Sequence, residues 1–149
     1  MPKKNLKNEL IKGSFWSFTT ALIAKLGGLI LTIILARYLL PEGFGLYSLA
    51  FSVAIIFVTF ADLGINNATV RYLSYELGRN GKKVFSYLAY FLKLKIKVAL
   101  LSSFALLISS YFLANLLFRK PEMFLLLVFL SFYIFIISVE GFFESLLYV

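Results

Sequence analysis

Four long apolar stretches separated by short polar segments dominate the pattern of this sequence. As a helix, each stretch is long enough to cross about 30 Å of hydrocarbon at about 1.5 Å of rise per residue. We therefore predict an all-α, polytopic membrane protein with four transmembrane helices. The predicted spans cover residues 14–37, 46–68, 98–118 and 123–145.

The segment between the first two spans predicts a tight turn at one membrane face. Pro41 cannot continue a helix, and it disfavours the α conformation at Leu40. Gly43 and Gly45 supply the backbone freedom that a turn requires. Arg37 precedes the break, where a cation suits the negative end of the helix dipole.

The segment 70–97 differs from the spans because charged residues alternate with aromatic residues and leucines. The sequence Gly78-Arg79-Asn80-Gly81 is typical of a turn. We predict that 70–97 is an amphipathic cytoplasmic hairpin lying near the lipid headgroups. Its basic residues are Arg71, Arg79, Lys82, Lys83, Lys93, Lys95 and Lys97.

The distribution of Lys and Arg predicts the orientation of the chain. Segments 1–13 and 70–97 together hold eleven basic residues, whereas the two opposite turns hold three. Cytoplasmic loops carry an excess of Lys and Arg, so both termini are expected in the cytoplasm. The predicted location is the cell (plasma or inner) membrane.

The composition agrees with a membrane protein and excludes several kinds of site. The chain is 61% hydrophobic and 15% charged, with a mean hydropathy of +0.91, whereas soluble domains are about 25% charged. The absence of Cys and His removes thiolate ligands and the commonest acid–base group. We expect no enzyme activity, no metal site and no cofactor. The net charge of +8 flanks apolar spans, which indicates anionic membrane lipids rather than nucleic acid as partners.

Four charged residues within or beside the spans are candidates for a substrate cavity. Lys25 lies near the middle of the first span, where a cation should face protein or water, although its long side chain could also reach an interface. Asp62 and Glu140 lie in the inner parts of their spans. Either acid could pair with Lys25, or with the many basic residues at the inner interface. Arg37 is better explained as an interface anchor than as a ligand.

Five motifs stand out between residues 12 and 74. They are Lys12-Gly13, Ile33-Ile34-Leu35-Ala36-Arg37-Tyr38-Leu39, Pro41-Glu42-Gly43-Phe44-Gly45-Leu46-Tyr47-Ser48-Leu49-Ala50, Phe60-Ala61-Asp62-Leu63-Gly64-Ile65 and Arg71-Tyr72-Leu73-Ser74. These motifs resemble the beginning of polysaccharide-biosynthesis flippases, the O-antigen and lipid-linked-oligosaccharide transporters of the multidrug/oligosaccharidyl-lipid/polysaccharide exporter superfamily. The resemblance covers residues 12–74, and Leu40 stands where Gly is typical of the family.

The resemblance implies a transporter of twelve to fourteen helices in two lobes, of which this chain is the beginning of the N-terminal lobe. It also implies that the substrate is a polyprenyl-diphosphate-linked oligosaccharide moved from the inner to the outer leaflet. Cavity cations of the family engage the anionic substrate, and Lys25 and Arg37 are the candidates here.

The sequence leaves two other functions open. One is a multidrug or cation antiporter of the same superfamily, for which Asp62 and Glu140 would serve as ligands. The other is a small four-span scaffold or accessory subunit. The apolar pattern reaches Val149 without a capping residue, so we expect an N-terminal fragment. Such a fragment would be inactive alone and would need the remaining helices of the transporter or a partner membrane protein.

Overall fold

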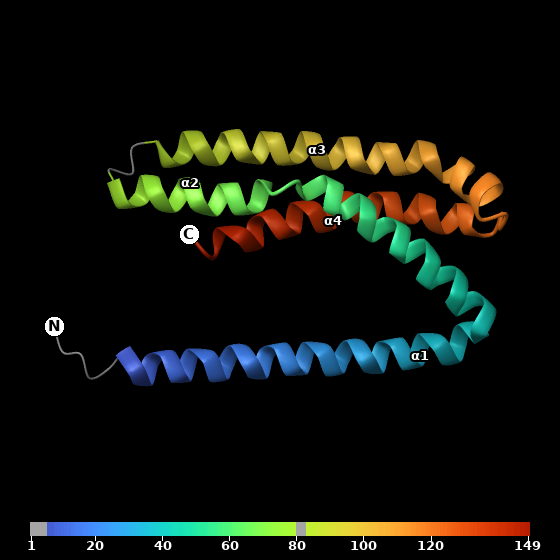
Figure 1. Ribbon diagram of the computed structural model, residues 1–149, viewed down its shortest axis with the longest axis horizontal. Coiled ribbons are helices and arrows are strands. Elements are labelled where there is room, and N and C mark those ends of the chain that lie inside the picture. The colour runs from blue at the N-terminus through green and yellow to red at the C-terminus, as the bar shows by residue number, and fades with distance from the viewer. Residues whose placement is uncertain (1–5, 80–82) are drawn as a thin grey trace. The chain divides into compact units, whose positions relative to one another are not determined.

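The computed structural model describes residues 6–79 and 83–149, with side chains from Gly13 onward, and every regular element in these ranges is helical (Figure 1). The elements are α1 (Leu6–Asp62), α2 (Ile65–Arg79), α3 (Val84–Phe112), the π-helical turn η1 (Leu113–Leu117) and α4 (Met123–Leu146). The predicted all-α class is confirmed. Lys3 and Lys4 of the basic N-terminal segment and Asn80–Gly81 of the predicted turn lie outside the described residues.

Three helical stretches of the described chain are long and apolar enough to cross a membrane. They are Gly13–Arg79, Val84–Leu117 and Met123–Leu146. Met123–Leu146 overlaps the predicted span 123–145, whereas Val84–Leu117 overlaps both the predicted span 98–118 and the second half of the predicted hairpin 70–97. The first extends over both the first and the second predicted span, so the structure supports a polytopic membrane protein at this coarser level.

The chain consists of two compact units, a first that ends at Gly45 and a second that comprises Leu46–Val149. Within the first unit the backbone of Leu40 is not helical, with φ 59° and ψ 167°. The helix therefore breaks at the residue before Pro41, as the sequence predicts. Such a conformation is adopted almost only by Gly, yet Leu40 has a full side chain that is exposed to the surroundings.

Within the second unit a further break separates α1 from α2. Leu63 and Gly64 both have left-handed backbones, with φ 43° and 78°. The Leu63 amide still bonds to the carbonyl of Thr59, and the Ala68 amide bonds to the carbonyl of Gly64. The helix thus ends at Asp62 and restarts at once. The predicted span over 46–68 therefore contains a helix break, because two successive left-handed residues cannot belong to an α-helix.

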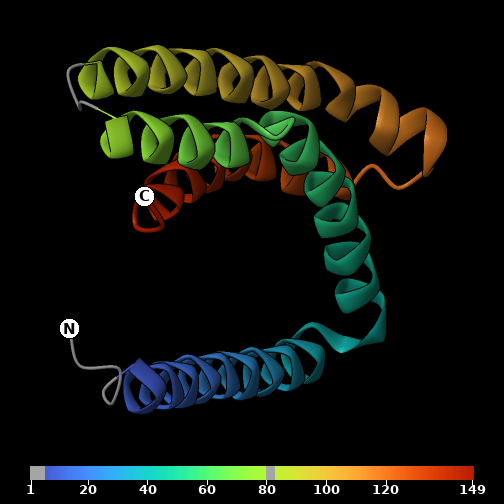
Figure 2. The same ribbon diagram turned by 60° about the vertical axis from the view of Figure 1, so that its left-hand side comes forward.

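The second unit packs as a helical bundle in which α2 and α4 lie beside α3 (Figures 1 and 2). Each helix buries residues spaced three or four apart, which form one face of a helix. The α2 face holds Ile65, Thr69 and Leu73; the α3 face holds Phe91, Lys95, Ala99, Ser102, Leu106 and Ser110; the α4 face holds Met123, Leu127, Ser131, Ile134, Ser138, Phe142 and Ser145.

Small residues allow these helices to approach closely. Ala50, Ala54, Ala61, Ala99 and Ala114 are almost completely buried. Hydroxyl groups add bonds between helices, since Ser102 on α3 donates to the Phe57 carbonyl on α1 at 2.6 Å. Ser103 likewise donates to the Ser131 carbonyl on α4 at 2.6 Å. Small residues and interhelical hydroxyl bonds are the means by which helices associate where no hydrophobic effect drives them together.

The connection between α3 and α4 is short and irregular. The helix widens over η1, where the Phe118 amide bonds to the Leu113 carbonyl at 2.9 Å. Arg119 then adopts a left-handed backbone with φ 53°, and α4 begins two residues after Pro121. The predicted break at Arg119–Glu122 is therefore present, and it returns the chain beside α3.

Candidate functional site

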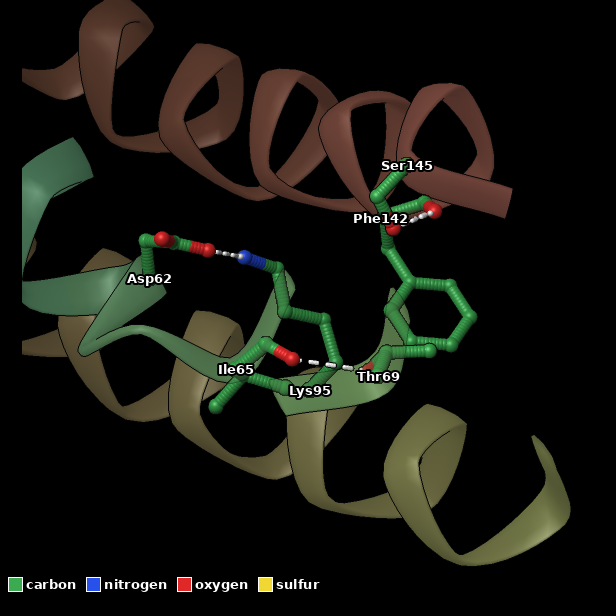
Figure 3. Close-up of polar contacts among 6 residues, drawn as sticks. All are labelled: Asp62, Ile65, Thr69, Lys95, Phe142 and Ser145. Atoms are coloured by element: carbon green, nitrogen blue, oxygen red, sulfur yellow. Dashed lines mark hydrogen bonds and ion pairs between the residues drawn. The ribbon is translucent and has the colours of Figure 1, made fainter. Parts of the chain in front are cut away.

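The second unit contains a buried ion pair between two helices. The Lys95 ammonium on α3 donates to Asp62 Oδ1, the last residue of α1, at 2.7 Å (Figure 3). The Lys95 side chain is 1% exposed and that of Asp62 is 33% exposed. It is the one ion pair among residues 13–79 and 83–149. A buried ammonium is costly unless it is paired, so Asp62 is what makes this position tolerable for Lys95.

The helix break positions the carboxylate. Asp62 ends α1, and the left-handed residues Leu63 and Gly64 turn the chain directly into α2. A carboxylate at the C-terminal end of a helix lies near the negative end of its dipole, which is unfavourable without a cation nearby. The Lys95 side chain extends from α3 to Asp62 and supplies that cation (Figure 3).

A polar layer that includes the pair lies between two apolar clusters. Along the chain, Asp62 lies between Ala61 of one cluster and Ile65 of the other. On α3, Lys95 and Ser102 lie between Phe91 and Leu106. On α4, Ser138 lies between Ile134 and Phe142. One cluster consists of Ala50, Ala54, Ala61, Leu106, Ala114, Met123, Leu127 and Ile134. The other consists of Ile65, Leu73, Phe91 and Phe142. The polar layer comprises Asp62, Asn66, Lys95, Ser102 and Ser138.

A pocket of about 330 Å³ opens within this layer. Its lining residues are Val58, Thr59, Asp62, Asn66, Lys95, Ile137, Ser138 and Gly141. Two of its buried oxygens, Asn66 Oδ1 and Ser138 Oγ, have no hydrogen-bond partner in the described part of the chain. Buried polar groups are nearly always paired, so these two oxygens indicate that the pocket accommodates a polar ligand or water.

Gly141 also contributes to the form of the pocket. A Cβ built at this position would lie 3.5 Å from Asn66 Nδ2, which is an ordinary van der Waals contact. Position 141 therefore has room for a methyl group beside the Asn66 amide.

The structure distributes the four predicted site residues over both units. Lys25 and Arg37 belong to the first unit, and both have exposed side chains. In the second unit Asp62 lines the polar pocket, whereas the exposed Glu140 does not. Of the two acids, Asp62 is the one whose carboxylate has a basic partner within the described part of the chain. That partner is Lys95, one of the basic residues of segment 70–97, and not Lys25.

Lys95 is the site residue that the sequence interpretation missed. Its neighbours Lys93 and Lys97 are exposed, and the alternation of the three lysines suggests an interfacial surface. However, Lys95 lies four residues after Phe91 and four before Ala99, both of which are buried. That helical spacing is the signal in the sequence that Lys95 faces the bundle interior.

A second pocket lies on the same unit near the end of α4. It is open, measures about 470 Å³, and is lined by Asn67, Val70, Arg71, Gly141, Glu144, Ser145 and Tyr148. Arg71 and Glu144 are exposed here, so this pocket lacks the desolvated charge of the first. No group of three His, Cys, Asp or Glu side chains capable of holding a metal ion occurs within the described residues.

Comparison with known proteins relates the whole bundle to one family. The sequence has no significant match among curated proteins and none among solved structures. It does match a family described as polysaccharide biosynthesis protein, over residues 10–148. That range includes the Leu40–Pro41 break, the Asp62–Lys95 pair and all of α4. With its membrane-length helices and nearly complete match, the chain belongs to the polysaccharide biosynthesis protein family.

Proposed function

We propose that this protein is a membrane transporter component that moves a polyprenyl-diphosphate-linked oligosaccharide from the inner to the outer leaflet for surface polysaccharide synthesis. The observation that carries the proposal is the family match over residues 10–148 on helices long and apolar enough to span a membrane. The proposed role is transport rather than catalysis.

The physical need for such a protein follows from the substrate. A diphosphate and a glycan carry many polar groups, each of which costs several kcal/mol when it is unsatisfied in hydrocarbon. A protein groove with fixed cations and hydrogen-bonding groups removes much of that barrier. Within the proposal, Lys25 and Arg37 are the cations that would contact the anionic diphosphate.

The proposed topology is four spans with both termini in the cytoplasm of a cell (plasma or inner) membrane. The break at Leu40 divides α1 into two segments, which supports two crossings in that helix, and α3 and α4 would supply the other two. The excess of basic residues in segments 1–13 and 70–97 supports the orientation. Alternating access requires two lobes around a shared site, so we propose that the chain acts only together with further membrane helices.

The cation antiporter has less support from the site. A cation-binding cavity needs an acid without a basic partner, whereas Asp62 is already paired with Lys95 and Glu140 is exposed. An accessory subunit would need no buried charge at all. A charged pair in membrane-length helices is costly, and such residues are by default candidates for a functional role.

A deletion strain of the native host tests the proposed function. Loss of the gene should reduce surface polysaccharide and cause the lipid-linked oligosaccharide to accumulate on the cytoplasmic face, where an impermeant glycosidase cannot reach it in intact spheroplasts. The full-length gene should restore export, whereas its Lys25→Ala and Arg37→Ala variants should restore less. Lys93→Ala is the matched control, because Lys93 is also an exposed lysine. Normal precursor turnover and surface glycan in the deletion strain would contradict the proposal.

A further inference from the structure

We propose that the open pocket between α2 and α4 binds the headgroup of phosphatidylethanolamine, a membrane lipid with one phosphate and one primary ammonium. Arg71 on one side of the pocket receives the phosphate, and Glu144 on the other side receives the ammonium. The proposal requires that α4 crosses a membrane, but it does not depend on the cargo that the protein transports.

The first argument is that the pocket contains two opposite charges that do not neutralise each other. Arg71 and Glu144 both line this space of about 470 Å³. Both side chains are exposed, and neither forms an ion pair with any residue of 13–79 and 83–149. Each charge is therefore available to a ligand, and a pocket with one charge of each sign is complementary to a zwitterion.

The second argument is the hydrogen-bonding groups beside each charge. Asn67 lies four residues before Arg71, so the two residues share one face of α2. The Arg71 guanidinium presents N–H donors in a fork that suits phosphate oxygens, and the Asn67 amide adds further donors. On α4, Ser145 follows Glu144, and its Oγ donates to the Phe142 carbonyl at 2.7 Å. The lone pairs of Ser145 Oγ, like the Glu144 carboxylate, are therefore acceptors for an ammonium.

The third argument is the position of the pocket along α4. The helix has 24 residues (Met123–Leu146), so it extends about 36 Å, slightly more than the hydrocarbon core of about 30 Å. Since α4 begins directly after the polar Arg119–Glu122 turn at one membrane face, its last turn reaches the headgroups of the opposite leaflet. Glu144 belongs to that last turn. The pocket therefore lies at the depth where lipid phosphates and ammonium groups are found.

The lining of the pocket selects among headgroups. The basic residues of segment 70–97 attract anionic lipids in general, but a headgroup without an ammonium would place its phosphate beside an unpaired Glu144 carboxylate. The primary ammonium of ethanolamine has three N–H donors for carboxylate and hydroxyl oxygens. The quaternary ammonium of choline has none and is recognised by cages of aromatic rings, whereas Tyr148 is the one aromatic residue among the described residues that line this pocket.

Thermal unfolding of the full-length protein in dodecyl maltoside, an uncharged detergent, tests the site without any glycan. Dioleoyl lipids with ethanolamine, glycerol or choline on the phosphate are titrated into the micelles, so that only the headgroup differs. A ligand that binds the folded state alone raises the melting temperature in a saturable manner. We expect half-saturation at a mole fraction of phosphatidylethanolamine about tenfold below that of either other lipid.

Substitutions on the two sides of the pocket should have different effects. Arg71→Gln removes the cation that binds the phosphate, so the half-saturating mole fraction of phosphatidylethanolamine should rise about tenfold. Glu144→Gln removes the partner of the ammonium and should abolish the preference over phosphatidylglycerol. Arg79→Gln and Glu122→Gln are the controls, because both side chains are exposed, on α2 and just before α4, yet lie outside the pocket. They should leave the response unchanged.

Three results would overturn the proposal. One is an equal response of the wild type to the three lipids, which would show that the acyl chains alone are bound. Another is a preference for phosphatidylethanolamine that survives in Glu144→Gln. The third is equal stabilisation by soluble glycerophosphoethanolamine at the same concentration, which would show that the pocket takes a free phosphate ester and not a lipid. Because Arg71 and Glu144 are exposed, their variants should melt at the wild-type temperature without added lipid, which separates lost binding from lost folding.

Discussion

Lys95 and Asp62 are 33 positions apart in the sequence, yet their charged atoms lie 2.7 Å apart inside the second unit. The pair joins the end of α1 to the N-terminal half of the buried face of α3. Because Lys95 is 1% exposed and Asp62 33% exposed, the lysine depends on the pair more strongly than the aspartate does. Substitutions of Asp62 and of Lys95 should therefore lower the stability of the protein by different amounts.

Replacing one member of the pair should cost more than replacing both. Asp62→Leu leaves a buried ammonium without a partner and should lower the free energy of unfolding by about 3 kcal/mol or more. Lys95→Met should cost about 2 kcal/mol, because the remaining carboxylate is partly exposed. The double variant Asp62→Leu/Lys95→Met should recover at least about 1 kcal/mol relative to Asp62→Leu.

Denaturant unfolding of the full-length protein in mixed micelles measures this difference. Lys93→Met is the control, since Lys93 is exposed on the same helix and should change stability by less than about 0.5 kcal/mol. Additive single costs, with no recovery in the double variant, would show that the pair contributes nothing as a pair.

Leu40→Gly should stabilise the protein. Leu40 has φ 59° and ψ 167°, a region in which a residue with a side chain costs about 1–3 kcal/mol. Its side chain is 68% exposed, so little packing is lost when it is removed. Since Gly also raises the entropy of the unfolded chain, we expect a net gain of about 1 kcal/mol, seen as a higher melting temperature. Leu35→Gly, inside the preceding helix, should be destabilising instead, by about 1 kcal/mol.

Ala99→Leu should disrupt the bundle. Ala99 is 0% exposed on α3 and belongs to the face that contacts the other helices. Extra methylene groups in a tightly packed interior cost about 1–3 kcal/mol, and they would also press on the neighbouring Lys95 turn. Expression and the melting temperature in detergent measure the effect. The adjacent Leu100 is exposed, and Leu100→Ala should leave both nearly unchanged; an equal loss in the two variants would argue against close packing at Ala99.

Single cysteines test the proposed orientation directly. The sequence contains no Cys, so each introduced thiol reports on one position. Glu42→Cys and Glu122→Cys should react with an impermeant maleimide in intact cells, because both side chains are exposed at turns assigned to the outer face. Ser86→Cys, exposed near the start of α3, should react only after the membrane is permeabilised. The opposite labelling pattern would reverse the proposed topology.

The local features of the fold can be read from the sequence because they depend on neighbouring residues. Pro41 determines the break at Leu40, and Pro121 lies just before α4. The motifs around Pro41 and Asp62 are sufficient to identify the family, which the match over residues 10–148 confirms.

The partner of Asp62 is harder to predict because it depends on how helices pack. Hydropathy treats Lys93, Lys95 and Lys97 alike, whereas packing selects Lys95 alone for the interior. Leu63 is a similar case, since neither its residue type nor its neighbours indicate a left-handed backbone before Gly64. The helical spacing of Phe91, Lys95 and Ala99 predicts that these residues share one face of α3, but it does not tell which helices pack against that face.

The polar layer has a further consequence for the dynamics of the bundle. It divides the apolar interior into the cluster around Leu106 and Ile134 and the cluster around Phe91 and Phe142. Contiguous apolar contacts are what make a region open as one cooperative unit. We therefore expect the two ends of α3 and α4 to open as two separate foldons, with amide protons that exchange with solvent in two groups of different opening free energy.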